Sequence, residues 1–245
     1  MHHIALESVD STNAEAQRLI ATGAVCGWTM ITARLQHAGR GRQSRSWTSP
    51  PGNLYVSFIV PKDQRGEWRR PWLSGFAVAL ALANTVEDHI DDGADVRIKW
   101  PNDVLITNAK AGGILIEAGA AAPFLVIGIG VNLASHPPDT RYPATHVAAH
   151  RAGSLTPLAF ANRLAAHLQQ MIERWLADGF TPIRAEYLKK SHRPGDPLTI
   201  GASSAAPRHG NFIGIDEEGC LCLECDGAFV RFAAGDVFPT LTPSP

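Results

Sequence analysis

Residues 36–47 carry a dense set of basic and flexible residues: three arginines and two glycines, followed by a tryptophan. Glycine lets the backbone approach a ligand closely, and guanidinium groups bind phosphate or carboxylate oxygens in pairs. The composition favours a loop that closes over an anion. A solvated basic turn fits the same residues, and so does an arginine contact with the phosphates of a nucleic acid.

A second set of polar residues lies in residues 96–117, where two strand-like runs are joined by a short polar turn. Pro101 interrupts the first run and leaves Asn102 and Asp103 in a bend, while Lys110 begins the second run beside two glycines. If the two runs pair as a hairpin, the carboxylate of Asp103 and the ammonium of Lys110 come near one another. An ordinary surface ion pair would show the same pattern.

The third set stands where a short strand meets a predicted helix over residues 14–22. Thr12 and Glu15 have the spacing of a capping box. Ser11 and Asn13 lie beside the free N–H groups of the helix start, which can bind a polar ligand or simply be capped.

Two glycines mark a possible floor for a flat ligand. Gly128 and Gly130 occupy alternate positions of an apolar strand over residues 123–133, so they face the same side of a sheet. Asn132 continues that side, and its amide could read the edge of a base through a paired donor and acceptor.

The composition is that of an ordinary globular protein, with 245 residues, 45% hydrophobic residues and a net charge of −1. This near-neutral balance argues against a protein that coats nucleic acid. The start of the chain does not read as a signal peptide, and no apolar run approaches the length of a membrane span, so we expect a cytoplasmic protein. Cys220, Cys222 and Cys225 lack the paired spacing of a zinc site and are predicted to be strand residues.

The periodicity of apolar residues predicts alternating strands and helices before about residue 193, and short strands after it. The predicted strands span residues 4–9, 28–35, 53–61, 96–106, 110–117 and 123–133, and the predicted helices span residues 14–22, 72–90, 157–177 and 180–190. Further strands are predicted at residues 197–200, 210–215, 220–224 and 228–232. The chain therefore divides into residues 1–192 and a small, barrel-like β unit at residues 193–245.

Taken together, these segments resemble the biotin protein ligases. The motifs that carry the resemblance lie, in order, at residues 10–13, 36–47, 99–103, 110–115 and 128–132. The resemblance implies an α+β fold, with a mixed sheet and helices as in biotin and lipoate ligases, followed by an SH3-like β-barrel. It also implies a two-step reaction, in which Mg²⁺-bound ATP activates biotin as biotinoyl-5′-AMP and a lysine of a biotin carboxyl carrier domain then displaces AMP.

The same resemblance assigns roles to individual residues. The residues matched to biotin contacts are Ser11, Thr12, Asn13, Gln36, Gly39, Arg40, Gly113 and Leu115. The residues matched to ATP or adenylate contacts are Arg40, Arg42, Arg45, Trp47, Lys99, Asn102, Lys110, Gly130 and Asn132. Among the residues given catalytic roles, Lys110 would offset charge developing between two anions, Arg42 would fold over the intermediate with the loop, and Asp103 would be the base for the incoming amine.

The chain departs from the family pattern at residues 43–44, where Gln-Ser replaces the usual Arg-Gly. We expect the intermediate to be held less tightly as a result. Some family members carry an N-terminal DNA-binding module; this chain starts at the first strand of the catalytic domain, so we expect no binding to DNA.

Other functions remain compatible with parts of the pattern. A lipoate ligase shares the fold and the adenylate chemistry, although the Gly-Arg loop and residues 99–103 favour biotin. A non-catalytic binder of biotin or a nucleotide would have less need of Lys110 and Asp103. An exposed sheet edge could receive either the carrier domain or a second copy of the chain in a homodimer.

Overall fold

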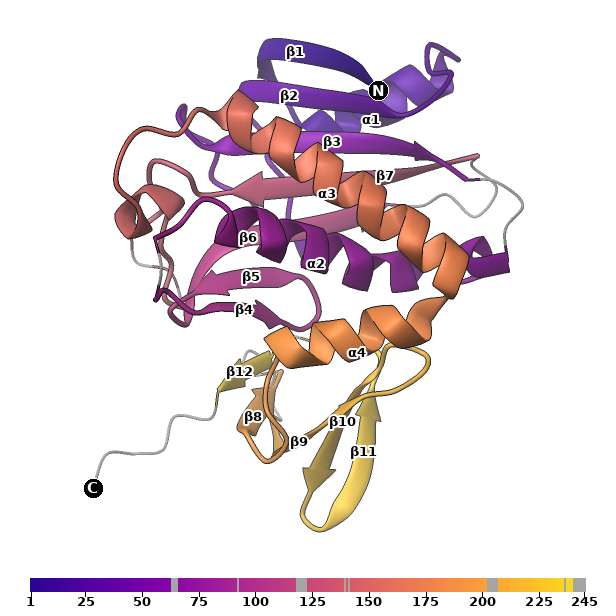
Figure 1. Ribbon diagram of the computed structural model, residues 1–245, viewed down its shortest axis with the longest axis vertical. Helices are drawn as coiled ribbons and strands as arrows, with labels where there is room; N and C mark the ends of the chain where they lie inside the picture. The colour runs from indigo at the N-terminus through magenta and orange to yellow at the C-terminus, as the bar shows by residue number, and fades with distance from the viewer. Residues whose placement is uncertain are drawn as a thin grey trace.

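The computed structural model describes residues 1–62, 66–91, 93–117, 123–138, 140, 142–201, 207–235 and 237–239. A seven-stranded mixed sheet forms the larger part of the molecule (Figure 1). Its strands, in spatial order, are β1 (His2–Val9), β2 (Thr29–Gln36), β3 (Leu54–Pro61), β7 (Phe124–Val131), β6 (Ala109–Glu117), β5 (Asp103–Ile106) and β4 (Val96–Lys99). β1 and β2 are parallel, and the remaining neighbours in this sheet are antiparallel.

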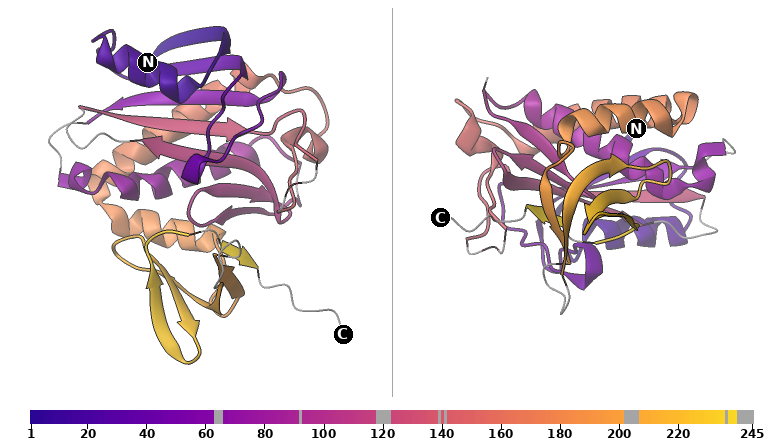
Figure 2. Two further views of the ribbon diagram at one scale, coloured as in Figure 1. Left: turned by 180° about the vertical axis from the view of Figure 1, so that it is seen from behind. Right: turned by 90° about the horizontal axis from the view of Figure 1, so that it is seen from below.

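Helices lie on both faces of this sheet. α2 (Ser74–Glu87) and α3 (Pro157–Asp178) cover one face, and α1 (Thr12–Ala21) covers the other (Figures 1 and 2). α2 is buried almost all round because it lies between the sheet and α3, and its run of alanines allows that close packing. Short 3-10 turns are present at Arg42–Ser44, Gly66–Arg69, Pro71–Leu73 and Val147–His150. Within the described ranges, no helix has the length and apolar character needed to cross a membrane.

The smaller sheet follows α4 (Phe180–Lys190) and lies below the larger one in Figure 1. Its spatial order is β11 (Ala228–Phe232), β10 (Leu221–Cys225), β9 (Arg208–Ile215), β8 (Pro197–Ile200) and β12 (Val237–Pro239). The four predicted strands are confirmed, whereas β12 was not predicted. The pairing is that of an open row of five strands in the described part of the chain, and the domain boundary at residue 193 stays a prediction.

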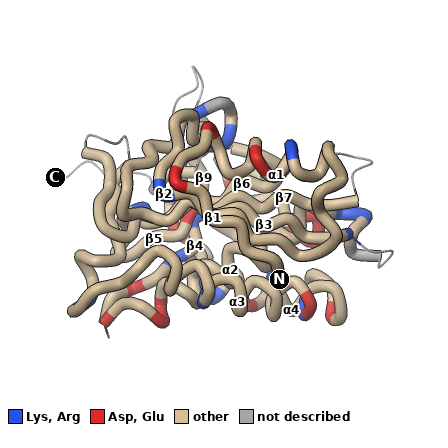
Figure 3. Tube along the Cα trace, turned by 90° about the horizontal axis from the view of Figure 1, so that it is seen from above, with Lys and Arg blue, Asp and Glu red and all other residues tan. Residues whose placement is uncertain are grey.

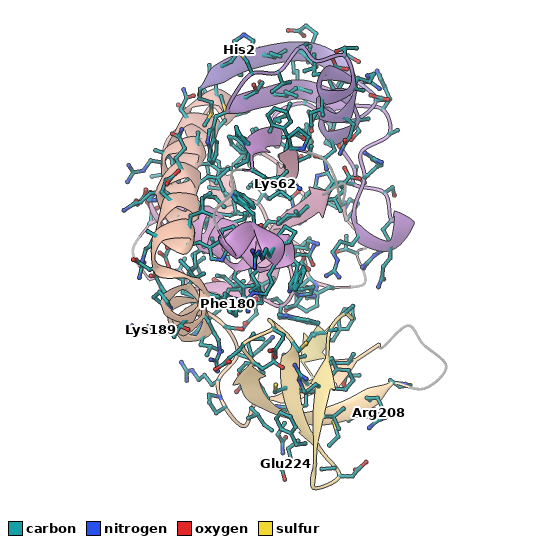
Figure 4. All side chains as sticks on the ribbon, turned by 90° about the vertical axis from the view of Figure 1, so that its right-hand side faces the viewer. His2, Lys62, Phe180, Lys189, Arg208 and Glu224 are labelled. Carbon is teal, nitrogen blue, oxygen red and sulfur yellow. The ribbon has the colours of Figure 1, made fainter. Side chains whose placement is uncertain are left out.

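Contacts between side chains and backbone join the smaller sheet to the larger unit. Trp100 Nε1 donates to the carbonyl of Gly219 at 3.2 Å, and Arg184 Nε donates to the carbonyl of Ile215. Gly219 has a φ of +81°, and a Cβ there would lie 2.9 Å from Phe76 of α2, so glycine permits this close approach. Figure 4 shows Phe180 at this junction, while Arg208 and Glu224 point away from it.

Three sequence predictions need correction. The capping box is not formed: Ser11 is the N-cap of α1 without a side-chain hydrogen bond, and Glu15 instead pairs with Arg18 at 2.8 Å. The helix predicted over residues 72–90 is shorter, because a 3-10 turn precedes α2 and the helix ends at Glu87. The strand predicted over residues 96–106 is two strands, β4 and β5, joined by a turn that contains the cis Trp100–Pro101 bond.

Candidate active site

A cavity of about 970 Å³ opens on the face of the larger sheet that is turned away from α2. A Cβ on Gly112 would meet Leu82 of α2, whereas one on the next residue, Gly113, would meet Trp47 on the opposite face. Residues 37–47 cross this second face, as the dark purple segment after β2 shows (Figure 2, left). The volume is in the range of small-molecule sites.

Nearly all of the predicted site residues line this cavity. They are Ser11, Thr12, Asn13, Gln36, Arg40, Arg42, Arg45, Trp47, Lys99, Asn102, Asp103, Lys110, Gly113, Leu115, Gly130 and Asn132. Gly39 is not on the lining. It lies behind Trp47, because a Cβ on Gly39 would be 2.4 Å from the Trp47 carbonyl oxygen.

Asp103 lies between two lysines. Lys110 Nζ is 2.7 Å from Asp103 Oδ1, and Lys99 Nζ is 3.3 Å from Asp103 Oδ2. The β5–β6 hairpin brings Asp103 and Lys110 together, as predicted. The Asp103 and Lys99 side chains are only 12% and 7% exposed, while that of Lys110 is 28% exposed. Two ammonium groups against one carboxylate leave an excess positive charge in a site that water screens weakly.

Two aromatic residues that the sequence did not indicate flank Lys99. Its Nζ lies 4.5 Å from the ring centre of Tyr142 and 4.8 Å from that of Phe238, and it donates to the carbonyl of Val237 at 3.1 Å. Phe238 and Val237 belong to β12, so the smaller sheet contributes directly to the cavity. Burial, and then the negative charge of Asp103, raise the pKa of the Tyr142 phenol.

The glycine floor exists, but side chains of the protein itself lie on it. The Trp47 indole covers Gly130, where a Cβ would lie 2.6 Å from Trp47 Cε2. The amide of Asn13 covers Gly128 in the same way. Lys110 Nζ lies 5.3 Å from the centre of the Trp47 ring. Trp47 Nε1 is buried without a hydrogen-bond partner among the described residues, so this donor is available to a ligand.

A hydrogen-bonded network fixes the polar groups at the start of α1. Gln36 Oε1 accepts from the backbone N–H of Thr12 at 2.8 Å, and Gln36 Nε2 donates to Ser49 Oγ at 3.0 Å. Ser57 Oγ lies within hydrogen-bond distance of both Thr12 Oγ1 (2.8 Å) and Asn13 Oδ1 (2.5 Å). Thr12 and Asn13 are buried at 4% and 3% exposure. Their side chains are therefore held in place before any ligand arrives. Sequence reasoning missed Ser57, which lies within an apolar strand.

The predicted anion-binding loop is a closed structure rather than a free turn. An isolated bridge joins Arg40 to Ser46, and the N–H of Trp47 donates to the carbonyl of Gly39 at 2.9 Å. Gln43 has a φ of 54°, a left-handed conformation that favours glycine. Arg42 Nη1 donates to Asn102 Oδ1 at 3.3 Å. The guanidinium group of Arg42 thus reaches the turn that precedes Asp103.

Asn132 and the segment after it form the far wall of the cavity. Asn132 Nδ2 donates to the carbonyls of Thr145 (3.0 Å) and Lys110 (3.4 Å), so its amide joins β6 to this segment. Part of the amide that was predicted to read a base edge is therefore used within the protein. The segment supplies lining residues that no sequence motif indicated: Pro137, Pro138, Thr140, Tyr142 and Ala144.

The cysteines lie away from the cavity lining. Cys222 and Cys225 are buried in β10, and Cys220 directly precedes this strand. In the ranges that the structure describes, no group of three histidine, cysteine, aspartate or glutamate residues could hold a metal ion. Basic and acidic positions are both scattered along the chain trace (Figure 3), in keeping with the near-zero net charge.

Comparisons with known proteins agree with this geometry. Residues 5–133 match the model of the biotin/lipoate A/B protein ligase family. The biotin–[acetyl-CoA-carboxylase] ligase of Paracoccus denitrificans is 37% identical over 95% of this chain and 98% of its own length. The enzyme of that name from Mycobacterium tuberculosis is 31% identical over 93% of this chain and 85% of its own. The structure of the Aquifex aeolicus biotin protein ligase in complex with biotin and ATP has a TM-score of 0.83 at 21% identity, covering 98% of this chain and 99% of that one.

Proposed function

The chain belongs to the biotin/lipoate A/B protein ligase family, and we propose that the cavity beneath residues 37–47 is where biotin and ATP react. The enzyme is an ATP-dependent ligase that adenylates biotin and transfers the biotinoyl group to a carboxylase. The assignment of individual residues to the two steps is the proposal, and it rests on the geometry of the cavity.

The two steps place different demands on the site. In the first, a biotin carboxylate oxygen attacks the α-phosphorus of ATP, the bond from that phosphorus to the bridging oxygen breaks, and pyrophosphate leaves. In the second, a lysine amine attacks the carbonyl carbon of the resulting mixed anhydride, AMP leaves, and the new amide nitrogen loses a proton. The first step brings two anions together, and the second needs a neutral amine.

The observation that carries the proposal is the pair of lysines around Asp103. Lys110 is the more exposed of the two, and its Nζ lies between the Asp103 carboxylate and the Trp47 ring. In this position it can offset the charge that develops between the biotin carboxylate and the α-phosphate. A charge already held in place is worth more than one that must be ordered during the reaction. Lys99, fixed between two aromatic rings, would serve the phosphate end.

The loop of residues 37–47 is proposed to shield the intermediate. A mixed anhydride is lost if water reaches it, so the site must close after the first step. Arg42 and Arg45 line the cavity, and Trp47 lies against its glycine floor. Packed on Gly130, the indole would contact one face of the bound adenylate. Ser44 stands where the family commonly has glycine, so this loop lacks one flexible hinge, and we expect a leakier lid over the intermediate.

The two ends of the cavity suit the two ends of the adenylate. The start of α1 offers fixed polar groups for the ureido head of biotin, through Thr12 and Asn13, with Gly113 and Leu115 nearby as an apolar wall. The opposite end, with Gly130, Asn102 and Asn132, would hold the nucleotide. An apolar wall with a few fixed polar groups is typical of a small-molecule site.

Asp103 is proposed to act twice. Both of its oxygens hold lysine ammonium groups, so it first positions Lys99 and Lys110. It can accept a proton from the incoming amine only after one lysine turns toward the substrate. Movement of Lys110 toward the adenylate would free Oδ1, and would make the base available after the intermediate has formed.

The carboxylates that the structure describes around the cavity do not fit a protein-held Mg²⁺. This ion prefers carboxylate oxygens and water, but Asp103 is paired with two lysines, and Glu117, near the loop, is paired with Arg40. We therefore propose that Mg²⁺ arrives on the ATP phosphates, and no step is assigned to a metal ligand of the protein.

ATP–pyrophosphate exchange tests the proposed function. The protein with ATP and Mg²⁺ should exchange labelled pyrophosphate when biotin is added, and should do so far less with lipoate. Exchange with lipoate alone would make the chain a lipoate ligase, and binding of biotin without any exchange would make it a non-catalytic binder.

We propose that the acceptor is one lysine of a biotin carboxyl carrier domain, since relatives are named as ligases of acetyl-CoA carboxylase. A cytoplasmic location, pairing of two copies and the lack of operator binding are likewise proposed, and an operator-selective gel shift would refute the last.

A further inference from the structure

Glu117, the last residue of β6, is not on the cavity lining but touches two residues that are. Its Oε2 accepts from Asn13 Nδ2 at 2.8 Å and lies 3.3 Å from Arg40 Nη2. One oxygen thus contacts the start of α1 and the loop of residues 37–47. A carboxylate beside a site for two anions would repel its ligands unless its charge is balanced, and Arg40 balances it here.

On the α1 side, Glu117 helps to orient the amide of Asn13. Ser57 Oγ donates to Asn13 Oδ1 at 2.5 Å, while Asn13 Nδ2 donates to Glu117 and, at 3.4 Å, to the carbonyl of Leu115. The shorter of the two Nδ2 contacts is the one to Glu117. Loss of this contact would free the amide that lies on Gly128.

On the loop side, Glu117 holds the residue at which the loop closes on itself. Arg40 forms the isolated bridge with Ser46, directly before Trp47. The Arg40 and Glu117 side chains are 45% and 29% exposed, so their ion pair is only partly screened by water. A change at Glu117 should therefore reach the lid through Arg40.

We propose that Glu117 is a positioning residue that couples Asn13, at the proposed biotin end of the cavity, to the lid, which is the loop of residues 37–47. This inference rests on the proposed function. Its carboxylate holds Asn13 and Arg40 together, so that the lid closes against the start of α1, where the Asn13 amide is already oriented. Glu117 touches neither reactant and acts only through these two residues.

Two substitutions separate the two contacts. Glu117→Gln retains an oxygen that can accept from Asn13 but removes the charge that attracts Arg40, whereas Glu117→Ala removes both. Without carrier, Glu117→Gln should release biotinoyl-AMP about threefold faster than the parent, at an unchanged KM for biotin. Glu117→Ala should release it as fast and also raise the KM for biotin about tenfold. Added salt should speed release from the parent more than from Glu117→Gln, because it screens the ion pair.

A matched control is available in Glu186→Gln, which removes the charge of a similar ion pair remote from the cavity. Arg174 and Glu186 are 38% and 26% exposed and lie on α3 and α4. This variant should leave release and KM unchanged. The thermal unfolding curve of Glu117→Gln shows whether this variant is folded. The inference is overturned if the folded variant releases biotinoyl-AMP at the parent's rate and with the parent's salt dependence. It is also overturned if Glu186→Gln speeds the release as much as Glu117→Gln does. Failure of the parent itself to form biotinoyl-AMP would refute the proposed function instead. If Glu117→Ala does not fold, the Gln variant decides alone.

Discussion

The contact between Trp47 and Gly130 can be broken by a single methyl group. In Gly130→Ala the new Cβ would lie 2.6, 2.7 and 2.9 Å from three indole atoms of Trp47, and no backbone atom is among these neighbours. The closest contact is about 0.8 Å inside the 3.4 Å at which ordinary contact begins. The indole must therefore leave the floor, while the strand itself can remain unchanged.

The cost follows from what the indole loses. Its ring is 5.3 Å from Lys110 Nζ, and a displacement of this size brings the pair to the limit of a cation–π contact. Loss of this contact and of part of the ring's burial should weaken retention of biotinoyl-AMP by about 1 to 2 kcal/mol, or about five- to thirtyfold. Gly214→Ala in β9 is the control, since a Cβ there meets nothing within 4 Å.

The assay is the rate at which biotinoyl-AMP leaves the enzyme in the absence of carrier. We expect faster release from Gly130→Ala and no change from Gly214→Ala. In a Trp47→Ala background, Gly130→Ala should have little further effect, because the group it displaces is gone. Parent-like release from Gly130→Ala, or an undiminished effect in the Trp47→Ala background, would show that the indole on the floor is not part of the lid.

Four further predictions concern other parts of the site and fold. Lys110→Ala should lower ATP–pyrophosphate exchange by at least about a hundredfold. Asp103→Asn should slow both ATP–pyrophosphate exchange and transfer to the carrier, because it releases both lysines. If Asp103→Asn slowed only the transfer, Asp103 would not position the lysines for the first step. Phe238→Ala should raise the KM for ATP about fivefold by removing one of the rings beside Lys99, and an unchanged KM would exclude that role. Burial lowers the pKa of His192 to about 4, so the folded protein keeps this residue neutral while the unfolded chain protonates it below its ordinary value of 6.5. Stability should fall by about 2 kcal/mol between pH 7 and pH 5 through this group, and His192→Phe should lose that share of the acid sensitivity in urea titrations.

Local motifs and strand periodicity predicted much of the site. The pairing of Asp103 with Lys110 followed from two runs separated by a short turn, since a hairpin brings such residues together whatever the rest of the fold does. The common face of Gly128 and Gly130 followed from the twofold repeat of a strand. Both depend only on neighbours along one or two elements.

Contacts between elements that are distant in the sequence could not be predicted from local patterns. Phe238 reaches Lys99 from a three-residue strand, too short to give a pattern, across more than half of the chain. Tyr142 lies in an irregular segment whose place is set by the Asn132 amide. Trp47 on Gly130 depends on how the loop folds back, which no local propensity decides. The capping box failed for a related reason: Gln36, from β2, supplies the acceptor for the N–H of Thr12.

The central claim is that this cavity activates biotin and delivers it to a protein lysine. The most direct measurement is incubation of the protein with ATP, Mg²⁺, labelled biotin and the apo form of a biotin carboxyl carrier domain, followed by mass analysis of the carrier. We predict ATP-dependent labelling of one carrier lysine, abolished by Lys110→Ala. An unlabelled carrier, in the presence of folded protein that binds both biotin and ATP, would contradict the claim.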